Sequence, residues 1–345
     1  MTEEQYRWVS EKKSAGTRWK DIAAEFSKKW EIITPAALRS RWERYTPRSN
    51  AMDLEPIATT LEDLASFVRG MELNAPSTSK PKSLPKKKGK DLRLPRKGRE
   101  IALFDMHYPY NIDLRNVIAF VKDYRPDVLI LGGDILDLPQ FSRWERGLHN
   151  LLASLPPPRA MYAKAKEEIF LPIRRAIGWN AALIYLGGNH EQRVEDAIKA
   201  DSKAEDWSIE ANFSDIIDLY VPYADEDVPN IYEMGDAIFT HGNRHNVHHA
   251  SYMAIEYGKT VRYGHTHDYQ VSTKRTAAGS GSYAIIAASC GCLRSLRPSW
   301  LRGKPNNWVN GFQYGYVDDN GVLFDNIVII QKDGRFMIGD KIYGW

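Results

Sequence analysis

The chain has 345 residues, of which 43% are hydrophobic and 26% are charged, and its formal net charge is +3. This composition is close to the average for globular proteins, so we expect a substantial core in one large domain, with room for a small second one. No apolar run approaches the roughly 20 residues that span a bilayer, and the N-terminus lacks a signal-peptide pattern. We therefore expect a cytoplasmic protein without a membrane partner.

Residues 1–46 have the pattern of a small all-α domain. A first helix is expected from Thr2 to Lys12, and a third begins at Thr34-Pro35, where the threonine can cap the helix and the proline suits its first turn. The second helix carries apolar residues at i, i+3, i+4 and i+7, namely Trp19, Ile22, Ala23 and Phe26. With its tryptophans and its basic third helix, the segment 1–46 resembles a Myb/SANT or homeodomain-like helix-turn-helix module.

That resemblance implies a third helix that enters the major groove of DNA. The residues that would face phosphates or base edges are Arg39, Ser40, Arg41 and Arg44. The alternative is a protein-interaction module whose arginines form a solvated face.

Residues 47–97 read as a linker, with one short helix expected from Leu61 to Met71. From Lys80 to Arg99 the chain is almost entirely basic, poor in apolar residues and interrupted by prolines, which is typical of a flexible segment. Lysines and arginines beside a DNA-binding module add attraction to DNA through counterion release, so the linker favours DNA as a partner.

Residues 98–345 alternate strands and helices at first and then change to consecutive strands. The expected strands are 99–104, 127–131, 181–186, 237–240, 260–263, 283–288, 312–317, 322–330 and 335–338. This order predicts an α/β domain built as a two-sheet sandwich flanked by helices. Cys290 and Cys292 are separated by one residue in an expected strand, so they would face the same side, and we interpret them as small core residues.

Five short polar motifs follow apolar runs in this domain, which places them where buried strands end. In order they are Asp105-x-His107, Gly133-Asp134-x-x-Asp137, Gly188-Asn189-His190-Glu191, His241-Gly242 and Gly264-His265-x-His267. Asp, Asn and His offer oxygen and imidazole nitrogen without any thiol, which favours borderline or hard metals. The ordered set resembles the calcineurin-like metallophosphoesterase family over residues 98–270, and implies that family's fold.

The resemblance implies two metal sites that share one carboxylate. Asp105, His107, Asp134 and His267 would hold one ion, while Asp134, Asn189, His241 and His265 would hold the other. We expect Asp105 and His107 to share a side of an extended segment. Two divalent ions, with Mn²⁺ first and Fe, Zn, Ni or Co as alternatives, would activate water and neutralise the phosphoryl oxygens.

His190 has no metal to bind in this scheme. The family histidine at that place protonates the leaving oxygen, and the near-neutral pKa of imidazole suits this role. Asp137 and Glu191 are interpreted as groups that orient the ligands, and Arg193 either clamps a phosphate or makes a surface ion pair. His245, His248 and His249 are placed in a polar loop after His241.

A basic and aromatic stretch lies between two expected strands, from Leu293 to Asn310. It contains Arg294, Arg297, Trp300, Arg302, Lys304 and Trp308. Cations interleaved with tryptophans suit a nucleic-acid strand, whose phosphates pair with the cations and whose bases stack on the indoles. An ordered loop packed on the sandwich is the alternative.

Three functions compete. The first is a metal-dependent phosphodiesterase or nuclease localised to DNA by the N-terminal module, an architecture that also suits a phage or mobile-element protein. The second is a phosphomonoesterase of proteins or small molecules, because the same two-metal chemistry serves both ester types. The third is a DNA-binding regulator with a vestigial phosphoesterase domain, which the intact ligand set disfavours. The basic segments favour the first.

Overall fold

A computed structural model describes residues 3–14, 17–30, 38, 94–141, 158–200, 202–275, 284–298 and 301–344. By its internal contacts the chain divides into two units, Met1–Glu62 and Asp63–Trp345. The predicted helix 61–71, the linker up to residue 93 and most of the third N-terminal helix lie outside the described residues, and so do Arg39, Arg41 and Arg44.

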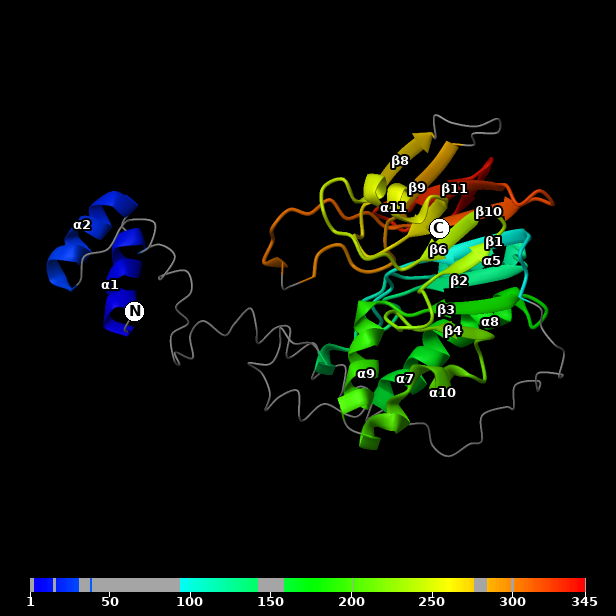
Figure 1. Cartoon of the computed structure of the whole chain (residues 1–345), viewed down its shortest axis with the longest axis horizontal. Coiled ribbons are helices and arrows are strands. Elements are labelled where there is room, and N and C mark those ends of the chain that lie inside the picture. Colours follow the sequence, from blue (N-terminus) through cyan, green and yellow to red (C-terminus); the bar gives the residue numbers. More distant parts are fainter. Residues whose placement is uncertain are drawn as a thin grey trace. The chain divides into compact units, whose positions relative to one another are not determined.

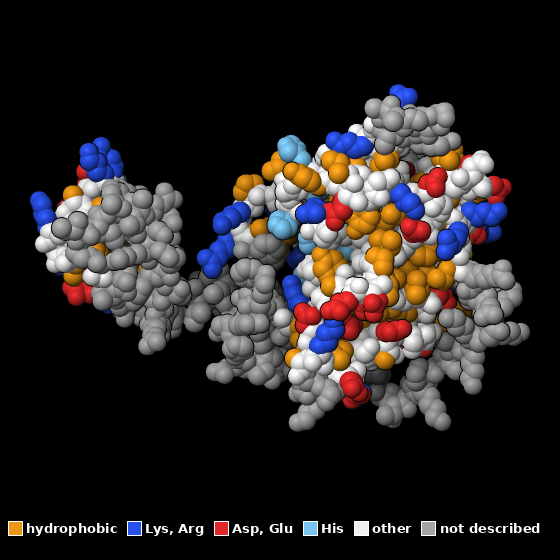
Figure 2. All heavy atoms as spheres, in the orientation of Figure 1, with side chains coloured by type: hydrophobic (Ala, Val, Ile, Leu, Met, Phe, Trp, Pro, Cys, Tyr) orange, Lys and Arg blue, Asp and Glu red, His pale blue; other side chains and the backbone are white. Residues whose placement is uncertain are grey.

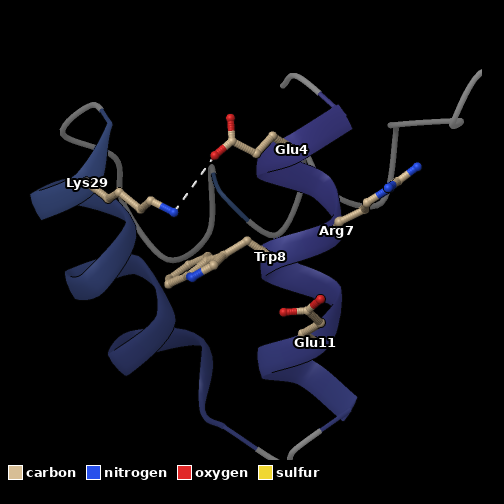
Figure 3. Close-up of a pocket in the computed structure, with 5 residues that line it drawn as sticks. All are labelled: Glu4, Arg7, Trp8, Glu11 and Lys29. Carbon is tan, nitrogen blue, oxygen red and sulfur yellow. Dashed lines mark ion pairs between the residues drawn. The ribbon is translucent and has the colours of Figure 1, made fainter.

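The N-terminal unit contains α1 (Glu3–Ser14) and α2 (Trp19–Lys29), as the sequence predicted. Its buried cluster consists of Val9, Ile22, Ala23, Phe26 and Leu38, with Trp8 and Trp30 packed against it. A shallow groove of about 480 Å³ lies over Trp8, where Glu4 pairs with Lys29 at 3.9 Å (Figure 3). Arg7 and Glu11 complete the lining, so this groove carries both signs of charge.

The first sheet of the second unit has six strands in the order β11-β10-β1-β2-β3-β4. Strands β1 to β4 are parallel, whereas β10 and β11 are antiparallel to their neighbours. Strands β2 and β3 are buried along their whole length, as expected of parallel strands covered on both faces. The bounds are β1 Gly98–Leu103, β2 Val128–Gly132, β3 Ala182–Leu186, β4 Leu219–Val221, β10 Gly311–Val317 and β11 Leu323–Ile329.

The second sheet has five strands in the order β5-β6-β7-β9-β8, with parallel pairs β6-β7 and β7-β9 and antiparallel pairs at both edges. Its strands are β5 Tyr232–Met234, β6 Ala237–Thr240, β7 Thr260–Tyr263, β8 Tyr269–Arg275 and β9 Ala284–Cys290. A separate hairpin pairs β12 (Phe336–Ile338) with β13 (Lys341–Tyr343).

The two sheets pack face to face, because one buried apolar cluster takes side chains from both. Ala102 and Ile130 of the first sheet belong to the same cluster as Met234 and Phe239 of the second. Helices cover the outer faces: α11 lies beside β8 and β9, and α7, α9 and α10 lie beside β3 and β4 (Figure 1). The helices are α5 Arg115–Tyr124, α7 Pro158–Ala165, α8 Leu171–Ile177, α9 Asn189–Ala200, α10 Ile209–Phe213 and α11 His249–Tyr257.

This unit is therefore mixed α/β with two large mixed sheets, compatible with the predicted sandwich. Cys290 and Cys292 are free and buried, which confirms their interpretation as core residues. The sequence missed β4, β5, β8, β13, α10 and α11. Strand β8 is a polar edge strand whose two faces alternate between exposed and half-buried, so it has no apolar run to reveal it. No helix within the described ranges is long and apolar enough to cross a membrane.

Candidate metal centre

Seven candidate ligands come from the ends of five strands. Asp105 and His107 follow β1, Asp134 follows β2, and Asn189 begins α9 after β3, all in the first sheet. In the second sheet, His241 follows β6, and His265 and His267 follow β7. Because the carboxyl ends of parallel strands lie at one edge of a sheet, each sheet delivers its residues to a single place.

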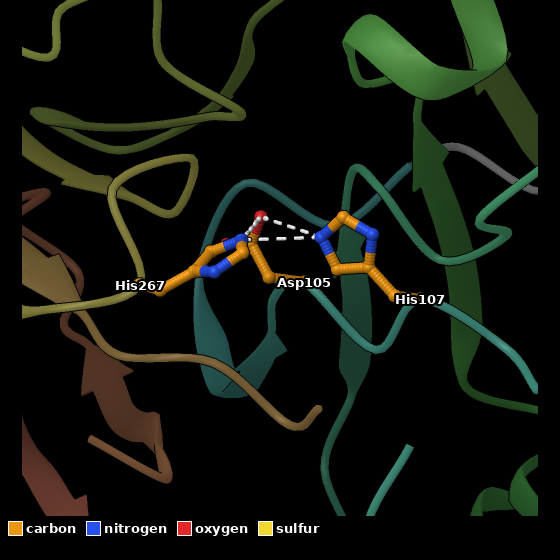
Figure 4. Close-up of side chains that lie close together, drawn as sticks. All are labelled: Asp105, His107 and His267. Atoms are coloured by element: carbon orange, nitrogen blue, oxygen red, sulfur yellow. Dashed lines mark hydrogen bonds and ion pairs between the residues drawn. The ribbon is translucent and has the colours of Figure 1, made fainter. Parts of the chain in front are cut away.

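The first group of donors is Asp105, His107 and His267 (Figure 4). His267 Nε2 lies 3.2 Å from Asp105 Oδ1 and 3.1 Å from His107 Nε2, and His107 Nε2 lies 3.8 Å from Asp105 Oδ1. All three side chains are buried, with at most 6% of their surface exposed. Three donor atoms from both sheets thus face one point.

The second group is Asn189, His241 and His265. Asn189 Oδ1 lies 2.9 Å from His265 Nδ1 and 3.2 Å from His241 Nε2, and the two imidazole nitrogens are 3.3 Å apart. Asp134 lies between the two groups, since its Oδ2 is 3.6 Å from both His107 Nε2 and His241 Nε2. One carboxylate oxygen therefore belongs to both donor sets.

The five shorter spacings, 2.9 to 3.3 Å, are close to those between ligands of one metal ion, and the three longer ones, 3.6 to 3.8 Å, are slightly wider. Ligands bonded at about 2.1 Å in tetrahedral or octahedral geometry lie roughly 3.0 to 3.5 Å from one another. His107 Nδ1 lies 2.8 Å from Asp137 Oδ1, and His241 Nδ1 lies 3.0 Å from the carbonyl oxygen of Gly132. Each Nδ1–H donates to its oxygen, so each Nε2 faces the centre, where its lone pair would be available to a bound ion. Asp105 Oδ1 is buried without a hydrogen-bond partner among the described residues, as a ligand atom would be.

Backbone groups aim the two carboxylates. Asp105 Oδ2 accepts from the N–H of His265 at 2.8 Å, and Asp134 Oδ1 accepts from the N–H of His190 at 2.9 Å. The other oxygen of each carboxylate is thereby turned toward the imidazoles. A Cβ atom at Gly264 would collide with the Asp105 carboxylate, and one at Gly188 with Asp134, so both close approaches require glycine.

The expectation of an extended Asp105–His107 segment was wrong. Five candidate ligands have left-handed backbone: Asp105 (φ 51°), His107 (φ 50°), Asp134 (φ 48°), His265 (φ 70°) and His267 (φ 63°). A non-glycine residue pays about 1 to 2 kcal/mol for this conformation. The loop after β1 turns because it hydrogen-bonds along the loop after β2, with Asp105 N donating to Gly133 O and His107 N to Asp134 O. The side chains converge through this turn and not through strand alternation.

Glu191 and Asp137 lie behind the candidate ligands. Glu191 is fully buried and accepts from the backbone N–H groups of Asp134, Leu136 and Gly188 and from the Tyr185 hydroxyl. It therefore ties the loop after β2 to the start of α9, although burial raises its pKa. Asp137 holds the His107 ring, and its own pKa is lowered to about 2 because the partnership with His107 and the nearby His190 outweighs burial.

The His190 ring stands edge-on to His107, with centroids 4.6 Å apart. Its Nδ1–H donates to the carbonyl oxygen of Asp137 at 2.5 Å, which turns Nε2 toward the centre, 3.8 Å from Asp134 Oδ2. Burial lowers the pKa of His190, against the raising effect of Asp134. Arg193 Nη1 lies 3.2 Å from His190 Nδ1, so this guanidinium lies beside the imidazole.

The placement of His249 in a polar loop was wrong. It is the first residue of α11 and is buried, with Nδ1 2.6 Å from the Tyr263 hydroxyl and Nε2 3.0 Å from Asp268 Oδ2. Asp268 follows His267 directly and also accepts from the Thr266 hydroxyl at 2.7 Å, so this pair braces the loop of the last two ligands. Sequence reasoning missed Asp268, although its place beside the Gly264–His267 motif was a usable signal. His245 is exposed near His265, at 6.3 Å between rings.

Comparison with models of known protein families finds no match. The "Gene 54 protein" of Mycobacterium phage D29 is 26% identical over 257 residues, which cover 71% of this chain and 98% of that protein. The "Gene 54 protein" of Mycobacterium phage L5 is 24% identical over the same length and with the same coverage. The chain is thus distantly similar to two phage proteins whose names state no activity.

The basic and aromatic stretch reaches the centre at two of its residues. Arg294 is buried, and its Nη1 lies 3.9 Å from Asp137 Oδ1. Trp308 packs edge-on against His267, with centroids 4.4 Å apart. Arg297 and Arg302 are exposed farther along the loop, and Trp300 lies outside the described residues. Arg294 and Trp308 are therefore part of the wall of the candidate centre.

Proposed function

We propose that this chain is a two-metal-dependent phosphoesterase of the calcineurin-like metallophosphoesterase family. The observation that carries the proposal is the pair of donor sets that share Asp134 Oδ2, at 3.6 Å from an imidazole nitrogen of each set. A carboxylate oxygen between two sets is the arrangement required to bridge two ions held about 3.5 to 4 Å apart. A site for one ion would not need donors on both sides of Asp134.

The donor types suit a divalent ion of borderline or hard character. The set consists of two carboxylates, one amide oxygen and four imidazoles, without a thiolate. Such a set suits Mn²⁺, with Fe, Zn, Ni or Co as alternatives. When bound, such ions would lower the pKa of a water molecule and neutralise the charge that develops on the phosphoryl oxygens.

The remaining residues orient and transfer protons. Asp137 and the Gly132 carbonyl fix the rings of His107 and His241 so that their Nε2 atoms face the centre. His190 Nε2 faces the same space, with its other nitrogen anchored to the Asp137 carbonyl. A protonated His190 there would donate its Nε2 proton to the leaving oxygen of the ester. Burial leaves the pKa of His190 below its usual value, although the negative charge of Asp134 nearby acts in favour of the protonated form.

For the substrate, we propose a phosphodiester of nucleic acid, most simply DNA. Support comes from two cations that lie beside the centre, the buried Arg294 and the half-buried Arg193, since guanidinium groups suit phosphate. The basic stretch Lys80–Arg99 adds sequence-independent attraction to polyanions. The distant similarity to two phage proteins fits the expected phage origin, and the names of those proteins state no activity.

A substrate panel with and without added Mn²⁺ tests the proposal. It contains bis-p-nitrophenyl phosphate, p-nitrophenyl phosphate, supercoiled plasmid, and single- and double-stranded oligonucleotides. We expect hydrolysis of the diester and of DNA that chelator abolishes. Hydrolysis of the monoester alone would favour a phosphomonoesterase, and inactivity on all substrates with every metal would overturn the proposal.

A further inference from the structure

The segment between β9 and β10 crosses from one sheet to the other beside the candidate centre. Both of its ends are fastened to ligand loops by backbone hydrogen bonds: Leu293 N donates to Asp105 O at 3.1 Å, and Val309 N donates to His267 O at 2.9 Å. Asn307 Nδ2 adds a bond to Asp268 Oδ2 at 3.1 Å. The segment is thus held in place by the same loops that carry the ligands.

Arg294, at the start of this segment, carries a positive charge that the described residues compensate only in part. It is 5% exposed, and its Nε has no hydrogen-bond partner among the described residues. Its nearest described carboxylate is Asp137, at 3.9 Å, which already accepts from His107. Its guanidinium carbon lies 5.4 Å from the Trp308 ring centroid. A buried guanidinium with an unpartnered N–H calls for an anion, because an uncompensated buried donor is costly.

Trp308, whose ring lies beside the Arg294 guanidinium, also lines a groove of about 630 Å³ in this segment. Trp308 forms the end nearest the centre, since its ring also contacts His267. Leucines and prolines line the apolar part, whereas Arg297 and Lys304 are the charged lining residues. None of the described lining residues is acidic. Figure 2 shows Lys and Arg side chains at the edge of this unit where the segment runs in Figure 1.

We propose that this groove is the subsite for an unpaired nucleoside attached to the reacting phosphate, with Trp308 as the platform for its base and Arg294 as a contact for the phosphate. The proposal rests on the proposed phosphodiesterase function and narrows its substrate to single-stranded nucleic acid, including frayed or flipped ends. Arg297 and Lys304 contact the next phosphate along the strand.

The chemistry of the groove favours this occupant. An indole face beside cations is the arrangement that binds single strands, because every base offers a π-face and every linkage a negative charge. A base inside a duplex is stacked on its neighbours and does not reach an indole within a groove. The volume lies within the 300 to 1,000 Å³ range of small-molecule pockets, which suits a nucleotide.

The test compares two esters with the same leaving group in the full chain loaded with Mn²⁺. One is the p-nitrophenyl ester of thymidine 5′-monophosphate, and the other is methyl p-nitrophenyl phosphate, in which a methyl group replaces the nucleoside. We expect wild type to prefer the nucleotide ester, mainly through a lower KM. In Trp308→Ala this preference should fall about 5- to 150-fold, the equivalent of a stacking contribution of about 1 to 3 kcal/mol, and Trp308→Phe should restore part of it.

A binding measurement separates this subsite from the metal chemistry. Calorimetry without turnover should show tighter binding of thymidine 5′-monophosphate than of inorganic phosphate to wild type, and a smaller difference in Trp308→Ala. The double variant Arg297→Ala/Lys304→Ala changes exposed side chains only, so it should fold and should weaken binding of the phosphorylated dinucleotide pdTpdT. Lys332→Ala, also exposed but in the turn before β12, is the matched charge control.

Equal losses for both esters in Trp308→Ala would mean that Trp308 only supports His267, and would overturn the subsite. Equal affinities of nucleotide and inorganic phosphate would overturn it as well. If wild type hydrolyses neither ester, the proposed function fails, and the calorimetric comparison alone decides whether the groove binds a nucleotide.

Discussion

The backbone N–H of His265 donates to Asp105 Oδ2 at 2.8 Å, across 160 residues of sequence and between the two sheets. This bond fixes one oxygen of Asp105 and leaves the other facing His267 Nε2 at 3.2 Å. The position of one ligand is therefore set by the loop that carries two others, and the centre forms only when both sheets are packed.

The first prediction concerns Gly264, which precedes His265. In Gly264→Ala the new Cβ would collide with the Asp105 carboxylate, so we expect Mn²⁺ affinity to fall at least tenfold together with a loss of stability. Gly258→Ala is the control, because its Cβ meets nothing within 4 Å and costs only backbone strain at φ 61°. Calorimetric Mn²⁺ titration of both variants checks this, and equal affinities would contradict it.

Asp134 should be required for both ions. Asp134→Ala removes the oxygen that lies 3.6 Å from an imidazole of each donor set, so we expect the Mn²⁺ content after dialysis to fall from two ions per chain to less than one. Elemental analysis beside the activity assay measures it, with exposed Glu226→Ala as the carboxylate control. A variant that retains both ions and full activity would refute the bridging role.

Replacement of His190 should lower the rate of ester hydrolysis more strongly for poorer leaving groups. His190→Gln keeps the ligands and should lower the rate roughly 10²- to 10⁴-fold for an alkoxide leaving group, the usual range for general acid catalysis. With p-nitrophenolate, which needs little protonation, the loss should shrink. The measurement is kcat over a series of esters of rising leaving-group pKa, and a slope identical to that of wild type would exclude His190 as the acid.

Glu100 should make stability fall as pH rises. It is fully buried in β1 beside Gln313, and burial raises its pKa from 4.5 to about 8. Between these two pH values the folded state holds a proton that the unfolded chain has released. The free energy of unfolding is therefore highest below pH 4.5 and falls as pH rises toward 8, by at most about 1.4 kcal/mol per pH unit. Glu100→Gln mimics the protonated form and should remove this slope.

The measurement for Glu100 is Tm at several values between pH 5 and pH 8.5 in chelator. We expect the difference in Tm, Glu100→Gln minus wild type, to become more positive as pH rises. Titrations elsewhere in the chain are common to both proteins and cancel in the difference. A constant difference would mean that Glu100 is ionised in the folded state.

The N-terminal unit and linker should supply DNA affinity without supplying chemistry. All seven candidate ligands lie beyond residue 104, whereas the densest basic run lies before it. A chain that begins at Leu94, which packs on the inter-sheet core, should hydrolyse a small diester at the full rate but bind long DNA more weakly. Anisotropy titrations of both chains at two salt concentrations check this; equal affinities would indicate a protein-interaction module.

The sequence by itself determined the strand ends, because apolar runs that stop at Asp, His or Asn are local signals. The candidate ligands were implied by the resemblance of the five motifs to a known family. The strands before Asp105, Asp134 and His241 were found within two residues of their bounds for that reason. The interpretation of Glu191 and Asp137 as groups that orient the ligands also came from their motifs.

Only the tertiary structure decided how those residues meet. The turn at Asp105 and His107, the burial of His249 against Asp268, and the approach of Arg294 and Trp308 to the centre all depend on hydrogen bonds and packing between segments far apart in the chain. A periodicity of two or 3.6 residues describes one element at a time and contains no information about its neighbours. Sequence patterns therefore singled out Arg294 and Trp308 as members of a basic and aromatic stretch, but they could not place these two residues beside the candidate ligands.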